Sequence, residues 1–574
     1  MHRFGCGSEF FRRVVVVTAV IALAPVARGA EPAGPPRLAV VIVVDQLRGD
    51  YLERWEKLFG EGGFRRICTD GAWFQNCHYP YAFTMTGPGH ASISTGVSPA
   101  KHGIVTNEWY DRAAGREVYC VDSERYERVP PANADPTVPP AKKQPLGLSP
   151  ERLLAPTVAD ALKDATGGKG RVVAVSFKDR SAVLMGGRRP DACYWFDTAD
   201  GQFVTSTYYR DALHSWVKEF NTGRPADRWF GKNWNRLRSD LDYPRHCGPD
   251  DIAGEGVGVG QGRRFPHPMD GGQKAAGKKY YDALYNSPFG NELLLDFVKK
   301  AVEAERLGED DTPDLLCVSF SSNDIVGHCW GPDSHEVLDT TLRTDLILKG
   351  LLDYLDTRVG KGRYVLALSA DHGICPLPEV ARGQGKDAGF VSPSLLTSQA
   401  DDFLQETFGK KGEKKSRWVE SDAGPGPWVY FNRAVLKDHG VEPADAEAAL
   451  VRWLRQQAGV QAAYGRSQLA DLPKGDVVGA AVRRSFHPDR CGDVAVVLKP
   501  HYLMSGKLTG TTHGTPHPYD THVPLVVFGP GVKPGARKEP VTPQAVAVIL
   551  ARALGMELPK DAEAAVPEGL FERR

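Results

Sequence analysis

The chain contains five uninterrupted runs of apolar residues, many of them β-branched. The runs read LAVVIVV, VVAVSF, LLCVSF, YVLALS and VPLVVFG, and they begin at Leu38, Val172, Leu315, Tyr364 and Val523. A strand without polar alternation is typical of a parallel sheet that is covered on both faces. We therefore predict five buried strands that belong to one sheet.

Amphipathic segments with a helical period lie between these runs. They span residues 159–166, 291–305, 335–357 and 543–554. Alternation of strand and helix predicts an α/β fold with a doubly wound, mostly parallel central sheet and helices on both faces. Ligands of such sheets bind beyond the carboxyl ends of the strands, so the residues that follow each strand are the first candidates for function.

Three regions depart from this alternation. Residues 120–150 are rich in proline, which predicts a long surface excursion. Residues 194–288 are rich in Trp, Tyr and Gly, and we expect them to form a cap inserted over the site. Residues 383–507 hold a charged loop, a helical pattern at about 444–457 and the strand-like run VAVVLKP. This third region predicts a small α+β insertion.

The composition is that of a globular protein. Of the 574 residues, 41% are hydrophobic and 25% are charged, which excludes a disordered or fibrous chain. Basic and acidic residues number 71 each. This balance gives no support for a nucleic-acid partner or for binding to a membrane surface through net charge.

Residues 1–29 have the three parts of a secretory signal peptide. Three arginines precede the apolar run VVVVTAVIALAPVA, and the tripeptide Ala-Arg-Gly at 27–29 offers a small-x-small cleavage site. The run is shorter than the about 20 residues of a transmembrane span and contains Pro25, which favours cleavage over the alternative, a retained anchor. We expect residues 30–574 to form the mature periplasmic or secreted chain, with no membrane span after cleavage.

The cysteines do not form a regular framework. There are 10 in the chain, and Cys6 lies in the expected signal peptide. The odd number that remains excludes complete pairing, and the spacing matches no zinc knuckle. Cys68 and Cys77 are the candidate pair for a disulfide.

Acidic and histidine residues stand where predicted strands end. Asp371 and His372 directly follow the fourth run, and an Asp/His pair at such a position suits zinc. Asp324 and His328 are four residues apart, one helical turn, so both side chains face the same point. Taken singly, each pair is also explained by a helix-capping Asp and a hydrogen-bonded or surface His.

Together with residues elsewhere in the chain, these pairs predict a binuclear metal site. The six N and O ligands supply about three for each of two Zn²⁺ ions, and they are Asp45, Asp324, His328, Asp371, His372 and His513. Two metal ions of this kind hold the attacking and leaving oxygens of a phosphoryl transfer.

The segment YPYAFTMTGPGHASISTG places Thr86 directly before Gly-Pro-Gly-His, at a junction between a loop and a predicted helix. A hydroxyl there lies among unpaired backbone N–H groups at the positive end of the helix dipole, which favours an alkoxide and an anionic substrate. Thr86 is therefore a candidate nucleophile that also completes one metal sphere. The alternative is that it only caps the helix.

Six motifs in order resemble the alkaline phosphatase superfamily, in particular its PafA-like, phosphate-irrepressible bacterial monoesterases. The motifs are DQLRGDYL, TMTGPGHASISTG followed by KHGIVTNEW, SFKDR, SNDIVGH, SADHG and THGTPHPYDTHVPL, and they run from residue 38 to 529. The resemblance implies a secreted enzyme with a threonine nucleophile and two zinc ions.

Site residues follow from matching these motifs. The resemblance implies that Thr86 binds one zinc with Asp45, Asp371 and His372. It implies that the second zinc is bound by Asp324, His328 and His513, and that the phosphoryl oxygens are bound by Asn107, Lys178 and Arg180. His517 and His522 are nearby alternatives to His513, and His90 is expected to hold the nucleophile loop rather than a metal.

Four functions compete for this set of residues. A zinc-dependent phosphate monoesterase acting through a phosphothreonine needs cations for a dianion, and Lys178 and Arg180 supply them. A phosphodiesterase or nucleotide pyrophosphatase is the alternative that shares the metal ligands. A sulfatase requires a C/S-x-P-x-R segment, which the residues around Thr86 do not provide. A zinc-stabilised binding protein would lack a ligand or the nucleophile, and none is missing.

Overall fold

The structure is a computed structural model, and it describes residues 35–131, 146–412, 414–420, 426–557, 559 and 561–572. The predicted signal peptide at 1–29 and much of the proline-rich stretch at 120–150 lie outside these residues. Among the residues that are described, no helix is both long enough and apolar enough to cross a membrane.

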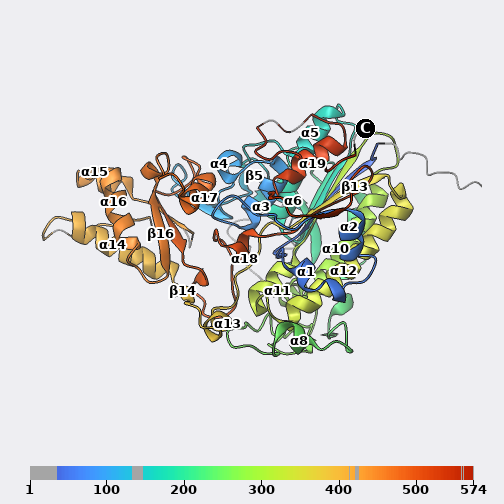
Figure 1. Ribbon diagram of the computed structural model, residues 1–574, viewed down its shortest axis with the longest axis horizontal. Coiled ribbons are helices and arrows are strands. Elements are labelled where there is room, and N and C mark those ends of the chain that lie inside the picture. Colours follow the sequence, from blue (N-terminus) through green and yellow to red (C-terminus); the bar gives the residue numbers. More distant parts are fainter. Residues whose placement is uncertain are drawn as a thin grey trace, which may run out of the picture. The chain divides into compact units, whose positions relative to one another are not determined.

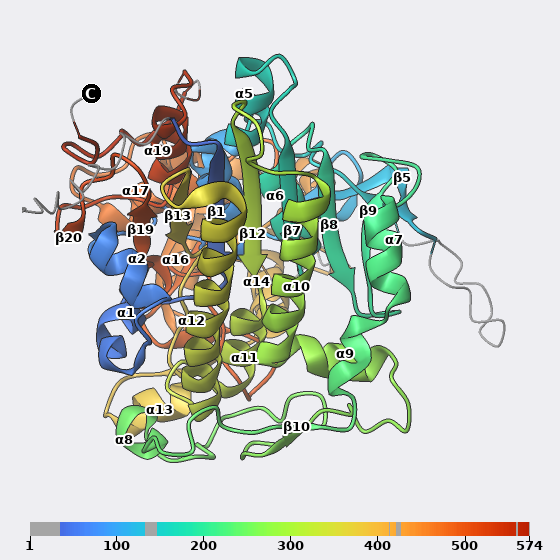
Figure 2. The same cartoon turned by 90° about the vertical axis from the view of Figure 1, so that its right-hand side faces the viewer.

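Five parallel strands form the centre of an eleven-stranded sheet. In spatial order they are β13 (Tyr364–Ser369), β1 (Leu38–Val44), β12 (Asp314–Phe320), β7 (Val172–Ser176) and β8 (Ala192–Asp197). The first four match predicted strands, and every residue in them is buried, as a run without polar alternation requires. Figure 2 shows them side by side.

The two margins of the sheet are largely antiparallel. The strand predicted near Val523 is β19 (Leu525–Phe528), and it runs antiparallel to both β13 and β2 (Ala72–Phe74). Beyond them β20 (Gly535–Arg537) pairs with β2 in parallel. The sheet is therefore mixed, and the prediction of a mostly parallel sheet holds only for its centre. The apolar run near Val523 indicates burial on both faces but carries no information on direction.

At the margin beyond β8, the strands come from the two regions that were predicted to be a cap and a surface excursion. β8 and β9 (Gln202–Ser206) form a hairpin in the sheet, so residues 194–206 are not part of a cap. Gly201 allows the turn because its φ of 71° is left-handed. β5 (Asp122–Val129) and β6 (Leu146–Leu148) continue the sheet within the predicted excursion. β5 reads DSERYERV, and so polar a strand at the margin of a sheet has the same sequence pattern as a surface segment.

Helices cover both faces of the sheet (Figure 1). The four predicted helices are present as α5 (Val158–Ala165), α10 (Pro288–Ala304), α12 (His335–Leu355) and α19 (Ala545–Ala553). α10 and α12 pack together on one face with α11 (Ser322–Trp330), and on the other α5 and α19 pack with the remaining helices of that layer, α3 (Thr86–Thr95) and α6 (Asp179–Gly186). The doubly wound α/β arrangement is thus confirmed at the centre of the molecule.

Between β9 and α10 the chain makes short elements that pack on α10 and α12. They are α7 (Ser215–Thr222), the 3-10 helix η2 (Pro225–Trp229), β10 (Asn233–Trp234), α8 (Tyr243–Cys247), β11 (His267–Pro268) and α9 (Lys278–Tyr285). The remaining short elements outside residues 389–504 are α1 (Tyr51–Arg54), η1 (Glu56–Leu58), α2 (Phe64–Asp70), α4 (Pro99–His102), β3 (Glu108–Asp111), β4 (Arg116–Tyr119), the π-helix η3 (Asp356–Gly360), α13 (Pro378–Gly383) and α18 (Pro518–Thr521).

A second, smaller hydrophobic core lies within residues 389–504, drawn in orange in Figure 1. Its three-stranded antiparallel sheet has the order β15 (Trp428–Val429), β17 (Val494–Leu498) and β16 (Val460–Gly465). The other elements within these residues are β14 (Gly389–Val391), α14 (Pro393–Phe408), α15 (Arg433–Asp438), α16 (Pro443–Leu454), η4 (Arg466–Gln468), α17 (Val477–Ser485) and β18 (Tyr502–Met504). Of these, α17 packs against α4 and the main core. β17 alternates, with Val497 in the main core and Val496 in the smaller one, so this strand joins the two.

All nine cysteines among the described residues are free, so the disulfide considered for Cys68 and Cys77 is not formed.

Candidate active site and metal centre

Four central strands, β1, β7, β12 and β13, end at the same edge of the sheet, and charged side chains follow each of them. The register pairs Val44 of β1 with Phe320 of β12, and Val43 with Ser369 of β13. The strands therefore end nearly level. The residues that follow are Asp45 after β1, Lys178 after β7, Asp324 at the start of α11 and Asp371 after β13. This is the edge at which α/β sheets bind ligands.

Thr86 is the first residue of α3, and its side chain is not a helix cap. The N-cap position belongs to Met85, and no side chain makes a capping hydrogen bond there. The Thr86 hydroxyl is almost fully buried. Its Oγ1 accepts hydrogen bonds from Lys178 Nζ and Arg180 Nη2, each at 3.2 Å. The geometry thus favours the candidate nucleophile over the capping alternative.

Gly89 lets the start of α3 approach the end of β13. A Cβ at this position would lie 2.2 Å from the carbonyl oxygen of Asp371, so no larger residue fits. His90 secures the same junction: its Nδ1 donates to the Thr86 carbonyl at 2.9 Å, and its Nε2 lies 2.9 Å from Ser319 Oγ. With both nitrogens engaged, His90 supports the loop, in keeping with the role expected for it, although Nδ1 is also 3.3 Å from Asp371 Oδ2.

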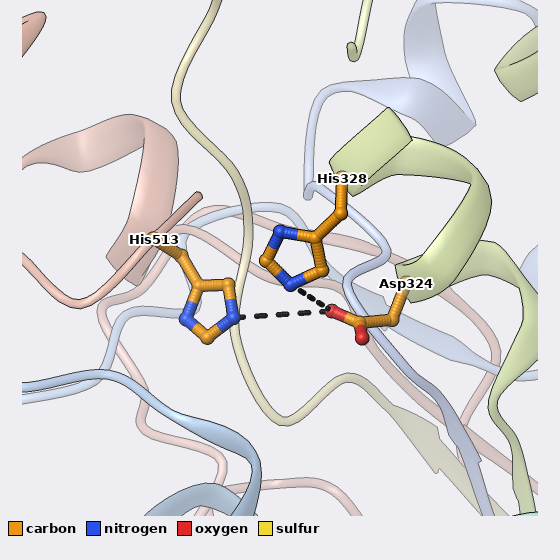
Figure 3. Close-up of side chains that lie close together, drawn as sticks. All are labelled: Asp324, His328 and His513. Atoms are coloured by element: carbon orange, nitrogen blue, oxygen red, sulfur yellow. Dashed lines mark ion pairs between the residues drawn. The ribbon is translucent and has the colours of Figure 1, made fainter. Parts of the chain in front are cut away.

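Asp324, His328 and His513 form one candidate metal group (Figure 3). The Nε2 atoms of His328 and His513 lie 3.2 Å and 3.8 Å from Asp324 Oδ1. The Nδ1 atoms lie 2.7 Å from the carbonyls of Thr511 and Thr84 respectively. A carbonyl can only accept, so each Nδ1 carries the proton and each Nε2 keeps a lone pair for a cation.

The two nearby alternatives to His513 are engaged outside this group. His517 Nε2 donates to the carbonyl of Leu498 at 2.9 Å, and His522 Nε2 donates to that of Gln75 at the same distance. In each the ring nitrogen that His513 directs at Asp324 is already used by the backbone. The geometry therefore favours His513.

Asp45, Asp371 and His372 meet in a second buried group. His372 Nε2 lies 3.7 Å from Asp45 Oδ1 and 3.4 Å from Asp371 Oδ2, while its Nδ1 donates to the carbonyl of Gly373 at 2.9 Å. Three atoms facing one another here are buried without a hydrogen-bond partner: Asp45 Oδ1, Asp371 Oδ2 and His372 Nε2. Buried polar atoms without partners are costly, and a cation would satisfy all three. The residues present therefore fit a bound metal.

Lys178 is the cation that contacts the buried carboxylates of the site. Lys178 Nζ lies 2.8 Å from Asp45 Oδ2 and 2.6 Å from Asp324 Oδ2. Burial and the charge of Asp371 still raise the pKa of Asp45 well above its usual range. Burial lowers the pKa of His372 to about 3, so this imidazole is neutral, as a metal ligand must be. Divalent cations would offset the repulsion among the carboxylates.

Asn107 and Arg180 border the nucleophile. Asn107 Oδ1 accepts the backbone N–H of Gly87 at 2.8 Å, which fixes the amide beside the first turn of α3. Arg180 Nη1 donates to the Tyr119 hydroxyl at 3.1 Å, and that hydroxyl donates to Asp179. The structure thus brings every predicted site residue to one place.

Comparison with known proteins supports a single family. The model of the family described as type I phosphodiesterase / nucleotide pyrophosphatase matches residues 39–520. Alkaline phosphatase PafA of Elizabethkingia meningoseptica is 34% identical over 529 residues, which are 92% of this chain and 93% of that protein. Alkaline phosphatase PhoV of Synechococcus elongatus is 34% identical over 504 residues, or 87% and 86%. The crystal structure of wild-type PafA matches with a TM-score of 0.85 and 33% identity, covering 94% of this chain and 100% of that one.

The chain belongs to the PafA-like alkaline phosphatases. The predicted family and its α/β fold are therefore confirmed, and the protein is a phosphatase of the hydrolase class. The alternative of a binding protein without catalytic activity is wrong. The family model also covers phosphodiesterases, so family membership by itself leaves the choice between monoesters and diesters to the residues of the site.

Two residues that hold site side chains in place are not predicted by the sequence analysis, and they are Tyr119 and Gln46. Tyr119 ends β4, the second strand of a hairpin, and no motif includes it, so nothing in the sequence connects it to Arg180. Gln46 is the easier of the two to predict, because it directly follows Asp45 in the sequence. Its Nε2 donates to Asp324 Oδ1 at 2.6 Å and its backbone N–H to Asp371 Oδ1 at 3.1 Å. Its φ of 67° is a left-handed conformation, which marks a functional strand end.

Proposed function

We propose that this phosphatase hydrolyses phosphate monoesters of small molecules through a phosphothreonine formed at Thr86. The observation that carries the proposal is the contact of two cationic side chains, Lys178 and Arg180, with one buried hydroxyl. Cations in a water-poor site favour the alkoxide and bind the doubly charged phosphoryl group of a monoester.

The chain's own residues account for both chemical steps. Thr86 Oγ attacks phosphorus in line, the bond between phosphorus and the ester oxygen breaks, and the alcohol leaves. Lys178, Arg180 and Asn107 bind the phosphoryl oxygens as charge shifts onto them. Water then attacks the phosphothreonine, which releases inorganic phosphate and restores the Thr86 hydroxyl.

Two Zn²⁺ ions are the proposed cofactors. Asp45, Thr86, Asp371 and His372 would hold one, because the carboxylates of Asp45 and Asp371 both lie close to His372 Nε2. The group of Asp324, His328 and His513 would hold the other. When bound, such ions lower the pKa of a coordinated hydroxyl and neutralise charge on attacking and leaving oxygens. The unpartnered atoms of the site and the lone pairs on Nε2 support this assignment.

A diester hydrolase is the second candidate, favoured by the description of the family model. A diester carries one negative charge and a second substituent, so it gains less from two cations beside the nucleophile. The experiment is to compare kcat/KM of the mature enzyme for 4-nitrophenyl phosphate and for bis(4-nitrophenyl) phosphate, with and without a chelator. We expect the monoester to be favoured by several powers of ten, and both activities to be lost with chelator. A preference for the diester would overturn the proposal.

Metal content tests the ligand sets separately from activity. We expect about two equivalents of zinc in the purified enzyme and about one in the variant His513→Ala, because only one group loses a ligand. His517→Ala is the matched control, four residues away, and should keep about two. If His517→Ala loses zinc and His513→Ala does not, the assignment of the late histidine is wrong.

The predicted signal peptide at 1–29 supports export to the periplasm or beyond, where the substrates would be extracellular phosphate esters. Mass measurement of the N-terminus of exported protein tests this, and an uncleaved N-terminus would favour the retained anchor.

A further inference from the structure

A cavity of about 240 Å³ lies between the catalytic residues and the smaller α+β unit. On one side its wall contains Asn107, His328 and His513. On the other side the wall comes from the ends of β17 and β18, in the unit with the second hydrophobic core. The cavity is therefore continuous with the proposed metal group that contains Asp324.

The wall opposite the metal group is mostly apolar. Phe83 and Met85 line the cavity from the segment before α3, and the smaller unit contributes Pro427, Val496, Val497, Leu498, Leu503 and Met504, with Tyr502 as its one polar side chain. No Lys, Arg, Asp or Glu is among the described residues that line it. A ligand portion that is charged would lose hydration here without gaining a partner, whereas an apolar portion would be removed from water.

Leu503 occupies a special place in this wall. It is 2% exposed, yet it is part of neither hydrophobic core as the described residues define them. It lines both the 240 Å³ cavity and a neighbouring one of about 510 Å³, and both cavities reach His328. β18 holds Leu503 in register with Phe390 of β14, which fixes its position. Its apolar surface thus borders space beside the metal group.

The charged side of the site lies elsewhere. A third cavity, of about 410 Å³, is lined by Lys178 and Arg180 together with Arg128, Asp179, Asp197 and Asp282. The two cations that would bind a phosphoryl group therefore line a different cavity from the apolar wall, although Lys178 also contacts Asp324. In an in-line displacement the leaving group departs on the side opposite the nucleophile, and a cation held by Asp324, His328 and His513 would stabilise its oxygen.

We infer that the cavity beside His328 and His513 binds the leaving group of the monoester, and that Leu503 makes the enzyme select alkyl and aryl leaving groups over small or polar ones. The inference rests on the proposed monoesterase function and adds the substrate class. Leu503 is a specificity-determining residue in this assignment, and the smaller α+β unit is the part of the chain that supplies it.

The test compares hexyl phosphate with ethyl phosphate and glycerol 3-phosphate. Hexyl and ethyl phosphate have leaving alkoxides of nearly equal basicity, so a difference in kcat/KM reports binding of the chain. We expect the wild type to prefer hexyl phosphate roughly ten-fold, a preference that Leu503→Asn removes and Leu503→Met retains. Leu395→Asn is the matched control, because Leu395 belongs to the same unit and is 57% exposed; it should leave the ratio unchanged.

Inhibition constants distinguish a loss of alkyl-chain binding in Leu503→Asn from a general loss of folded enzyme. Inhibition constants for hexylphosphonate and methylphosphonate should differ in the wild type and converge in Leu503→Asn, while inhibition by inorganic phosphate stays unchanged. Equal kcat/KM for hexyl and ethyl phosphate in the wild type overturns the inference without any variant. An unchanged ratio in folded Leu503→Asn does so as well. If the wild type hydrolyses none of these monoesters but cleaves diesters, the proposed function fails instead.

Discussion

Thr86→Ala should lose nearly all turnover of phosphate monoesters, on the order of four powers of ten in kcat. The hydroxyl is the only group of this residue that can attack phosphorus, and it is buried between Lys178 Nζ and Arg180 Nη2. Without it, water has to attack the ester directly. Thr86→Ser restores a hydroxyl at the same position and should keep part of the activity. Steady-state kinetics with 4-nitrophenyl phosphate measure both variants.

Thr84→Ala provides the control for this variant. Thr84 lies two residues earlier, and its Oγ1 donates to the Thr515 carbonyl at 3.2 Å rather than facing the two cations. This variant should retain most of its turnover. Acid quenching followed by mass spectrometry should find phosphate on Thr86 and not on Thr84. Full activity in Thr86→Ala would transfer the role of nucleophile to Thr84 or to water.

Much of this site is predictable because its residues are tied to strand ends. Asp45 and Asp371 each follow a run whose burial is evident from composition, and parallel strands place such residues at a common edge. Asp324 and His328 are related by a helical turn, which spacing alone reveals. For these residues a local rule determines where the side chain lies.

Other parts depend on contacts that no local rule describes. Strand β5 is polar and becomes part of the sheet only because β9 offers it a partner, so its pattern resembles a surface segment. The direction of β19 is set by its neighbours and not by its apolar run. Leu503 looks like any leucine in a strand, and its place between two cavities depends on how two cores meet.

The choice among late histidines shows the same limit. Three histidines within ten residues have similar sequence surroundings, and only their hydrogen bonds distinguish them. His517 and His522 give Nε2 to backbone carbonyls, whereas His513 gives Nδ1 and so keeps Nε2 for Asp324. Which ring nitrogen of a histidine bonds to a carbonyl depends on the tertiary structure, so it cannot be predicted from the sequence alone.

Replacing both Lys178 and Arg180 with alanine should reduce monoester kcat/KM by about two to four powers of ten. Each charge-assisted contact to a phosphoryl oxygen is worth about 1.5–3 kcal/mol, and two such contacts correspond to a change of that size in rate. A monoester is a dianion and a diester is a monoanion, so diester hydrolysis should fall much less. The ratio of the two activities is the quantity to measure, with zinc content determined on the same samples.

Lys178 also contacts Asp45 and Asp324, so a loss of metal has to be separated from a loss of phosphate binding. Arg180 alone avoids this overlap, because its contacts are Thr86 and Tyr119. Arg180→Ala should therefore shift the ratio with zinc content unchanged. Lys163→Ala is the control: it removes another buried cation, paired with Asp191 at 2.6 Å, and should leave the ratio as it is. If the double variant lowers both activities equally while zinc stays bound, these two residues do not set the preference for monoesters, and the diester hydrolase becomes the better assignment.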